Sequence, residues 1–393
     1  MDKIKKLAIV TCCLDDWGGS EELWAKSIAI LLEENIKHIT IFKNRINRQH
    51  KEYLKLAKRN VKLKELDPIL SLGLNMINQL KNIFSHLGEK FGINDYAWNK
   101  PAKRLFDYLK ADRPNLVLIS QGINFDGLVY ANQCLKLKIP YLIVSHKAVD
   151  FFWPAVNDRT YMKETLLKAE KCFFVSEHNR RLTEEQFGLR LLNSEIIFNP
   201  VKTTVSPLPY PPVTQGYRLA CVGRLFVIDK GQDILIRIMS KPKWKTRNIF
   251  ISFLGNGPDH QGLIEMAALL DVKNISFSGY NDRLENIWAN HHALILPSRS
   301  EGLPLTVIEA MSLGRMAIAT NAGGNIEIIK HEVNGFTGEP NEADFDHAME
   351  LAWNRRSEWE SFGIEASQSI ASSIPHLPER DFANVLKELL NEH

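Results

Sequence analysis

The sequence predicts an α/β fold of two parallel-sheet, Rossmann-like domains that face each other across a cleft. Short apolar runs alternate with helical patterns along most of the 393 residues, and a proline-rich stretch interrupts the alternation near the middle. Alternating strands and helices are typical of parallel sheets, because parallel neighbours need a crossover connection. A chain of this length also has room for two domains of ordinary size.

The first half of the chain, residues 1–199, is predicted to be the N-terminal domain. Its first strand and helix are expected in KLAIVTCCL and GSEELWAKSIAILLEEN, and further strands in HITIFK, PNLVLISQG, PYLIVSH and KCFFVSE. These are short apolar runs of the kind that buried strands make. Residues 66–110 have a less regular pattern, which is consistent with a helical insertion.

A linker and a second domain follow. Five of the 17 prolines lie between Pro200 and Pro212, so residues 200–215 are predicted to be the linker. The alternation then restarts in YRLACVGRL, IFISFLGNG, NISFSG, HALILPS and MAIATNAGG, which predicts a second domain over 216–375. The last segment, 376–393, is predicted to be an amphipathic helix that docks back on the N-terminal domain, from the helical spacing of Phe382, Val385, Leu386 and Leu389.

Composition and charge limit the compartment and the partners. An odd number of cysteines, five, without Cys-x-x-Cys spacing indicates a reducing compartment. No run of 18 apolar residues occurs, so no transmembrane helix is predicted. We therefore expect a cytoplasmic protein, with peripheral attachment to the inner face of a membrane as the alternative. Residues 1–199 carry 31 Lys and Arg against 23 Asp and Glu, whereas residues 200–393 carry 18 against 23, so the halves face different partners or surfaces.

No motif indicates a metal or a redox cofactor. The first strand is followed by DDWGGSEELW, which lacks the Gly-x-Gly of a nicotinamide site, and no Walker A loop is present. Asp344 and Asp346 have the Asp-x-Asp spacing that can hold a metal on a sugar nucleotide. They lie near an expected helix start, where a capping and dipole role explains them better. The twelve histidines show no metal-ligand spacing, so we expect neither metal nor cofactor.

Two loops of the second half carry candidate anion-binding residues, since ligands of parallel sheets bind beyond the carboxyl ends of the strands. Arg224 and Lys230 follow a strand in GRLFVIDKGQDIL, and two cations there suit a diphosphate; solvated surface cations are the alternative. In SEGLPLTVIEA, Glu301 precedes a helix that starts at Pro304, and Glu309 lies inside it. This loop is expected to bind an anion, with the glutamates binding hydroxyl groups beside it. An acidic first turn plus a solvated glutamate is the alternative.

Two features of the first half are also expected at the cleft. His146 ends the strand PYLIVSH, where a side chain faces a ligand site more often than the core. A structural histidine is the alternative. Gly18 and Gly19 follow the first strand, and their bare backbone would let a phosphate or a sugar approach closely.

Together these motifs resemble the retaining glycosyltransferases of family 4, which have the GT-B fold. The resemblance rests on VGRL with Lys230-Gly231, GNGP, LPSRSEGLPLTVIEAMSLG with its Glu-x7-Glu spacing, NAGGNIEII and VNGFTG, all in the second half. The first half matches only through its Gly-Gly loop, His146 and FNP, so the agreement covers roughly half of the chain. The family usually has Phe-Gly where this chain has Leu303-Pro304, which changes the backbone of that loop.

The resemblance implies the retaining, metal-independent transfer of a hexose from a nucleotide-diphosphate sugar, with a UDP-sugar as the default donor. Arg224 and Lys230 would neutralise the diphosphate. Glu309 would bind the ribose, and Glu301 the donor sugar. His146 would lie beside the reacting sugar.

Backbone groups would complete the implied donor site. The Gly302-Leu303 turn and the amides near Leu305 and Thr306 would bind phosphate oxygens, and the backbone around Tyr280 would lie near the base. The Gly18-Gly19 loop would contribute to the same site from the first half.

The first half would then receive the acceptor, which is a glycan, a lipid-linked glycan or a protein. Residues 43–64 hold nine Lys and Arg against one Glu, with Tyr53, Leu54 and Ala57 at roughly helical spacing. An anionic membrane surface is a candidate partner of this stretch, and an acidic glycan or a solvated basic helix without a partner is the alternative. Nucleic acid is not expected, because base-stacking aromatics are missing along the run.

Other functions use the same residues differently. Glu301 and Glu309 could form the acid–base pair of a hydrolase or phosphorylase. The chain could also be a non-catalytic protein that binds a nucleotide sugar, or an epimerase with the GT-B fold. Transfer is the preferred interpretation. The position of Glu309 inside the helix argues against an acid–base pair, and no further phosphate site for a phosphorylase is identified. A non-catalytic copy need not keep both cations and both glutamates, and the Glu-x7-Glu spacing favours transfer over epimerisation.

Overall fold

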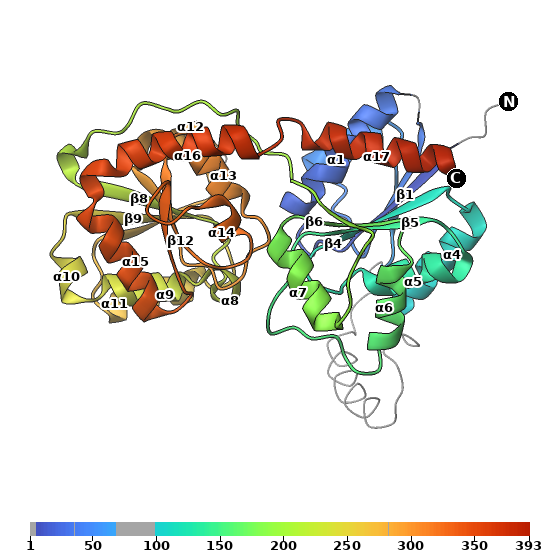
Figure 1. Cartoon of the computed structure of the whole chain (residues 1–393), viewed down its shortest axis with the longest axis horizontal. Helices are drawn as coiled ribbons and strands as arrows, with labels where there is room; N and C mark the ends of the chain where they lie inside the picture. The colour runs from blue at the N-terminus through green and yellow to red at the C-terminus, as the bar shows by residue number, and fades with distance from the viewer. Residues whose placement is uncertain (1–4, 35, 68–98, 282) are drawn as a thin grey trace. The chain divides into compact units, whose positions relative to one another are not determined.

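The computed structural model describes residues 5–34, 36–67, 99–281 and 283–393 (Figure 1). The chain divides into two compact units. Unit 1 comprises Met1–Pro200 and Leu377–His393, and unit 2 comprises Val201–His376. The first boundary lies where the proline-rich stretch begins.

Unit 1 contains a seven-stranded sheet in which all neighbouring strands are parallel, in the order β3-β2-β1-β4-β5-β6-β7. The strands are β1 Lys6–Thr11, β2 His38–Lys43, β3 Lys62–Glu65, β4 Leu116–Gln121, β5 Tyr141–Ser145, β6 Lys171–Phe174 and β7 Ser194–Ile196. The order reverses between β1 and β4, so their carboxyl ends mark the switch point at which ligands of such sheets bind.

Helices cover both faces of this sheet, because alternate residues of each strand point to opposite sides. Leu7 and Ile9 of β1 belong to one apolar cluster, and Ala8 and Val10 to another. The helices are α1 Gly19–Glu33, α2 Lys51–Lys58, α4 Lys100–Asp112, α5 Leu128–Leu137, α6 Arg159–Leu167, α7 Glu177–Phe187 and α17 Pro378–Glu392. Of the expected insertion 66–110, residues 68–98 lie outside the described residues.

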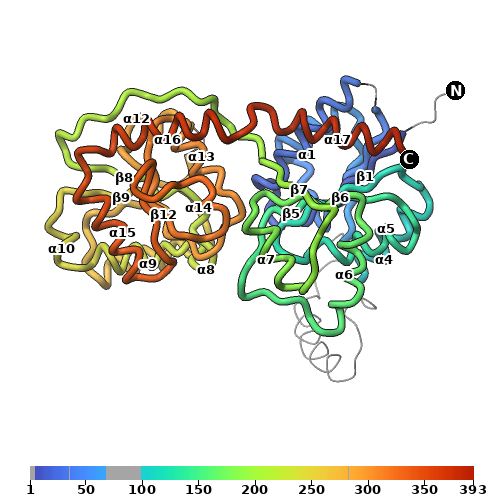
Figure 2. Tube along the Cα trace, in the orientation of Figure 1, coloured from blue at the N-terminus to red at the C-terminus, as the bar shows by residue number. Residues whose placement is uncertain are grey.

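The terminal helix α17 packs beside α1 (Figure 2). Phe382 and Leu386 of α17 lie in the same apolar cluster as Leu7 of β1. Ser27 of α1 adds a hydrogen bond from its hydroxyl to the carbonyl oxygen of Glu379 (2.8 Å). The apolar stripe of this helix is therefore buried within unit 1.

Unit 2 contains a six-stranded parallel sheet in the order β10-β9-β8-β11-β12-β13. The strands are β8 Tyr217–Val222, β9 Ile249–Leu254, β10 Ile275–Gly279, β11 Ala293–Leu296, β12 Met316–Thr320 and β13 Gly335–Gly338. Around them lie α8 Val227–Lys230, α9 Gln232–Met239, α10 Pro242–Lys245, α11 His260–Leu269, α12 Leu284–Asn290, α13 Leu305–Ser312, α14 Asn325–Ile328, α15 Glu342–Asn354 and α16 Trp359–Ser373.

Both units therefore have the predicted parallel architecture, and their central strands, such as β4 and β11, are buried along their whole length. In unit 2 the switch point lies between β8 and β11, so the loops after these strands are the expected ligand site. Among the described helices, none has the length and apolar character that crossing a membrane requires.

Candidate active site

The loop between β11 and α13 brings an acidic side chain to the start of a helix. Pro304 is the N-cap of α13 and has extended backbone angles (φ −74°, ψ 112°), with no side-chain cap. The amides of Leu305 and Thr306 therefore open the helix without an intrahelical acceptor. Such a helix start carries partial positive charge and can bind an anion.

Lys230, at the end of α8, forms an ion pair with Glu301 of that loop. The distance between Lys230 Nζ and Glu301 Oε1 is 2.6 Å, and Ser298 Oγ donates to the same oxygen at 2.7 Å. The Lys230 side chain is 23% exposed and that of Glu301 is 7% exposed, so the lysine is partly accessible while the glutamate is nearly enclosed. Because both bonds go to Oε1, the second oxygen, Oε2, can accept a hydrogen bond from a ligand.

Glycines hold this pair in place by close backbone contacts. At Gly231, which has φ +61°, a Cβ atom would lie 2.1 Å from the carbonyl oxygen of Pro297. At Gly323, which has φ +57°, it would lie 2.1 Å from the carbonyl oxygen of Glu301. A side chain at either position would require the backbone to move. The Lys230–Glu301 geometry is therefore built into the turns around it.

Arg224 follows β8 and lies near the same turn. Its Nη2 atom is 3.4 Å from Asp229 Oδ2, and its guanidinium lies 4.9 Å from the centroid of the Phe226 ring. The carbonyl of Asp229 accepts hydrogen bonds from the amides of Arg299 (2.8 Å) and Ser300 (3.1 Å). The loop after β8 is thus tied to the loop after β11, and the partly exposed guanidinium stands beside it.

The structure places the other predicted donor residues, Glu309, Leu303 and Tyr280, on a helix and on two loops of unit 2. Glu309 is buried inside α13, about one turn beyond its start, and Leu303 is buried in the preceding loop. Tyr280 follows β10 and is exposed. Sequence reasoning missed Ser298, although it lies three residues before Glu301 in the quoted motif.

In unit 1, His146 follows β5 and meets a residue from the neighbouring strand. His146 Nε2 lies 3.2 Å from the hydroxyl oxygen of Ser120 at the end of β4, and the histidine is 8% exposed. Its Nδ1 atom is buried without a hydrogen-bond partner in the described part of the chain. Burial lowers the pKa of the imidazole to about 3, so the ring is neutral near pH 7. Sequence reasoning missed Ser120, which only the register of β4 and β5 brings to His146.

This burial gives a pH-dependent stability. The unfolded histidine takes up a proton near its ordinary pKa of 6.5, but the folded one does so only near 3, so the unfolded state holds more protons between these values. The contribution of His146 to the free energy of unfolding is complete above pH 6.5 and falls as the pH decreases toward 3. We expect His146→Gln to reduce the stability loss between pH 7 and pH 5 by about 2 kcal/mol, measured by urea unfolding. An unchanged loss would mean that His146 is not buried as a neutral ring.

The Gly18-Gly19 loop is fixed by a buried ion pair that sequence reasoning did not predict. Gly18 is the N-cap of α1, and a Cβ atom there would lie 3.1 Å from Cys13 Sγ. Lys43 Nζ, at the end of β2, donates to the carbonyl oxygens of Asp15 (2.7 Å) and Asp16 (3.1 Å) and to Glu21 Oε1 (3.2 Å). The buried lysine thereby anchors the loop that leads to the two glycines.

The predicted basic surface of residues 43–64 needs correction at two positions. Lys43 is buried against Glu21, and Tyr53 lies fully inside the core. Neither side chain can contact a membrane, because each packs toward the sheet. The exposed face of α2 retains Leu54 with the lysines at 51, 55 and 58. A basic surface therefore remains, but with a single large apolar side chain on the helix.

The Asp-x-Asp pair has local structural contacts. The side chain of Asn341 caps α15 by accepting from the amide of Asp344 (3.0 Å) and donates to its carboxylate (2.7 Å). Asp346 Oδ1 accepts from the indole of Trp244 (2.6 Å), and Oδ2 pairs with Lys241 (3.0 Å). Asp344 is thus held in the first turn by the cap rather than being the cap itself. Within the described residues, no group of three or more His, Cys, Asp or Glu side chains is arranged to hold a metal.

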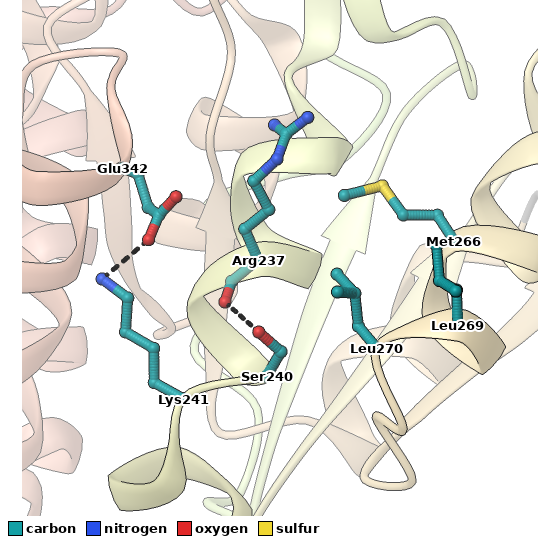
Figure 3. A pocket seen from close by; sticks show the side chains of 7 residues that line it. All are labelled: Arg237, Ser240, Lys241, Met266, Leu269, Leu270 and Glu342. Carbon is teal, nitrogen blue, oxygen red and sulfur yellow. Dashed lines mark hydrogen bonds and ion pairs between the residues drawn. The ribbon is translucent and has the colours of Figure 1, made fainter.

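A pocket elsewhere on unit 2 contains none of the predicted donor residues. Figure 3 shows it between the last turns of α9 and α11 and the start of α15. Its cations already have partners: Lys241 pairs with Glu342 (3.0 Å) and Arg237 with Asp233 (2.6 Å). Its other lining residues are Ser240, Met266, Leu269 and Leu270.

Comparisons with known proteins agree with this organisation. The model of the family "Glycosyl transferases group 1" matches residues 211–366. An "Uncharacterized glycosyltransferase" of Haemophilus influenzae (strain Rd) is 25% identical over 270 residues, which are 66% of this chain and 74% of that protein.

Solved structures resemble the whole chain. An apo lipopolysaccharide outer core galactosyltransferase has a TM-score of 0.69 at 20% identity, covering 98% of this chain and 99% of that one. Anabaena HepE in complex with UDP-glucose has a TM-score of 0.69 at 14% identity, covering 97% and 99%. The predicted α/β class of two parallel-sheet, Rossmann-like domains is confirmed by the two sheets and by these neighbours. Residues 211–366 therefore match the group 1 glycosyltransferases, and the chain as a whole has the fold of these solved structures.

Proposed function

We propose that the protein is a retaining glycosyltransferase of family 4 that transfers a hexose from a nucleotide-diphosphate sugar without a metal. The observation that carries the proposal is the Lys230–Glu301 ion pair (2.6 Å) in the loop that leads into α13. It combines a cation for phosphate with a carboxylate for sugar hydroxyls at a helix start that can bind an anion. UDP is the default nucleotide, which the UDP-glucose bound by HepE supports.

The cations would act on the leaving group. A nucleoside diphosphate gains negative charge as the glycosidic bond breaks, so Lys230, Arg224 and the start of α13 would stabilise the transition state more than the bound donor. Differential stabilisation of this kind accelerates the chemical step. Fixed cations thereby take the place that a metal ion holds in other transferases.

The remaining residues would hold the two sugars of the donor. Glu301 would accept a hydrogen bond from a hydroxyl of the transferred hexose through Oε2, and Glu309 would accept hydrogen bonds from the ribose hydroxyls. His146, neutral and with Nδ1 unpartnered, would bind the hexose as a neutral hydrogen-bonding group. Retention by double displacement would need a nucleophile, and no side chain is assigned that role, so we favour same-face transfer.

The acceptor is proposed to be a lipid-linked glycan, received by unit 1 at the cytoplasmic face of a membrane. The lipopolysaccharide galactosyltransferase with the same fold supports this choice, because its name describes a glycan on a lipid. The exposed lysines of α2 would add attraction to anionic lipids. A soluble glycan and a protein are the other acceptor classes.

Glu309→Ala is expected to weaken nucleotide binding, because ribose contacts are the same in the ground state and in the transition state. The dissociation constant of the nucleoside diphosphate should rise by about tenfold, as expected for a lost hydrogen bond to a charged group. Calorimetric titration of the variant with UDP checks this result. Unchanged affinity, together with a lower kcat, would move Glu309 to the reacting sugar.

A turnover assay distinguishes the candidate functions. A thermal-shift screen of nucleotide sugars first identifies the donor, because a ligand that binds only the folded state raises the melting temperature. The donor is then incubated alone, with phosphate, and with acceptor preparations. Transfer only with acceptor supports the proposal, whereas release of free sugar without acceptor indicates a hydrolase. Formation of a sugar phosphate indicates a phosphorylase, and formation of an altered sugar on the same nucleotide indicates an epimerase. Binding of the donor without turnover indicates a non-catalytic protein.

A further inference from the structure

The connection between β5 and α6 presents a row of large apolar side chains to solvent. Phe151, Phe152, Trp153 and Val156 are 59%, 46%, 64% and 87% exposed. We call these four residues the aromatic loop. Large exposed apolar groups that are contiguous commonly mark an interaction site, whereas isolated ones need no explanation.

Buried polar side chains hold the backbone at the base of this loop. Gln186 Nε2 donates to the carbonyl oxygens of Val149 (2.8 Å) and Phe152 (2.6 Å). Asn124 Oδ1 accepts from the amide of Val149 (2.7 Å). The backbone is therefore anchored from below while the rings point outward.

The composition and size of the aromatic loop favour a lipid surface over a protein. A stable protein interface buries roughly 800 Å² on each partner, but three aromatic side chains of roughly 200 Å² each, about half exposed, supply much less. A bilayer interface needs only a few inserted rings. The indole of Trp153 donates to the carbonyl oxygen of Asp150 (3.2 Å), so it has an apolar body and a polar edge, as side chains at the headgroup level do.

The position of the loop connects it to the proposed reaction. Phe151 lies five residues after His146, the residue proposed to bind the transferred sugar, in the unit that would receive the acceptor. Asp150 is itself exposed, so insertion of apolar side chains should matter more here than lipid charge. The lysines of α2 would supply a separate, salt-sensitive contribution.

We propose that the aromatic loop inserts into the interface of a lipid bilayer. This inference deepens the proposed function and rests on its lipid-linked acceptor, because it names the surface through which unit 1 would reach that acceptor. The insertion replaces water around the rings with lipid and leaves the anchored backbone in place.

The test is sedimentation of the full chain with vesicles of pure phosphatidylcholine, and with vesicles of graded anionic content. We expect the wild type to bind neutral vesicles at high salt, and the double variant Phe151→Ser/Trp153→Ser to bind at least about tenfold more weakly. Leu192→Ser is the matched control, since Leu192 is 98% exposed on the same unit outside the loop, and its binding should be unchanged. Quenching of tryptophan fluorescence by brominated lipid should fall in Trp153→Phe.

The results separate this inference from the proposed function. Equal binding by the wild type and the double variant, or no binding of the wild type to neutral vesicles, would overturn the inference. A thermal shift with UDP is measured on the same proteins, and its persistence shows that the variants are folded. Vesicle binding without any nucleotide response would contradict the proposed function but would still support insertion of the aromatic loop into a bilayer.

Discussion

Lys230→Ala is expected to lower the rate of sugar transfer by on the order of 10² or more, the largest effect of any single substitution in unit 2. The ammonium lies 2.6 Å from Glu301 Oε1, so its removal takes a cation from the departing diphosphate and leaves a nearly enclosed carboxylate without its cationic partner. The unpaired carboxylate of Glu301 would also repel the negatively charged phosphates. Steady-state kinetics with the identified nucleotide sugar measure the loss.

Two controls separate this role from a general effect of charge. Lys273 is also on unit 2. Its side chain is 86% exposed and pairs with Asp271 (3.3 Å), so Lys273→Ala should leave the rate unchanged. A chelator should likewise leave the wild-type rate nearly intact. If a chelator abolishes turnover and Mg²⁺ or Mn²⁺ restores it, the assignment of the leaving-group charge to Lys230 and Arg224 is wrong.

Glu301→Gln is expected to lower kcat by on the order of 10² while binding of the bare nucleoside diphosphate survives. The amide keeps the shape of the carboxylate but removes the negative charge that would face an electron-poor sugar. Glu301 accepts from both Lys230 and Ser298, so Ser298→Ala provides a milder variant that loosens the carboxylate without removing it. Steady-state kinetics on both variants measure kcat, and calorimetric titration measures their affinity for the nucleoside diphosphate.

His146→Ala is expected to follow the same pattern, with a lower kcat and retained nucleotide affinity. The outcome that reverses the assigned roles is loss of UDP affinity in His146→Ala together with normal affinity in Glu309→Ala. In that case the nucleotide would contact unit 1, and the acidic residue of α13 would not hold the ribose.

The sequence predicts the two sheets well, because their strands are apolar runs between helices. Most strands were expected from such runs, for example KLAIVT and PYLIVS. The edge strands β3 (Lys62–Glu65), β7 (Ser194–Ile196) and β13 (Gly335–Gly338) were not, because they are short and have little apolar pattern. Edge strands are half-exposed, so hydrophobicity alone does not distinguish them from loops.

The candidate site was only partly predictable. Lys230 and Glu301 were assigned separately, to phosphate and to sugar, since residues this far apart in sequence meet only when β8 and β11 pair. The burial of Lys43 was missed for a similar reason: in sequence it joins a run of exposed cations, and only the fold brings Glu21 to it.

The exposure of the aromatic loop is also not predictable from hydrophobicity. Phe151, Phe152 and Trp153 have the composition of a buried segment, and hydrophobicity alone would place them in the core. In the structure these side chains are exposed, and Gln186 and Asn124, from other parts of the chain, bind the backbone below them. Such long-range polar contacts leave no periodic signal in a sequence.

The most direct test of the central claim is calorimetric titration of the folded chain with UDP in the presence of a chelator. We expect one nucleotide to bind per chain, with affinity strongly reduced in the double variant Arg224→Ala/Lys230→Ala and unchanged in Lys273→Ala. The same binding in the double variant, or no response of the wild type to any nucleoside diphosphate, would contradict a donor site built on Arg224, Lys230 and the start of α13.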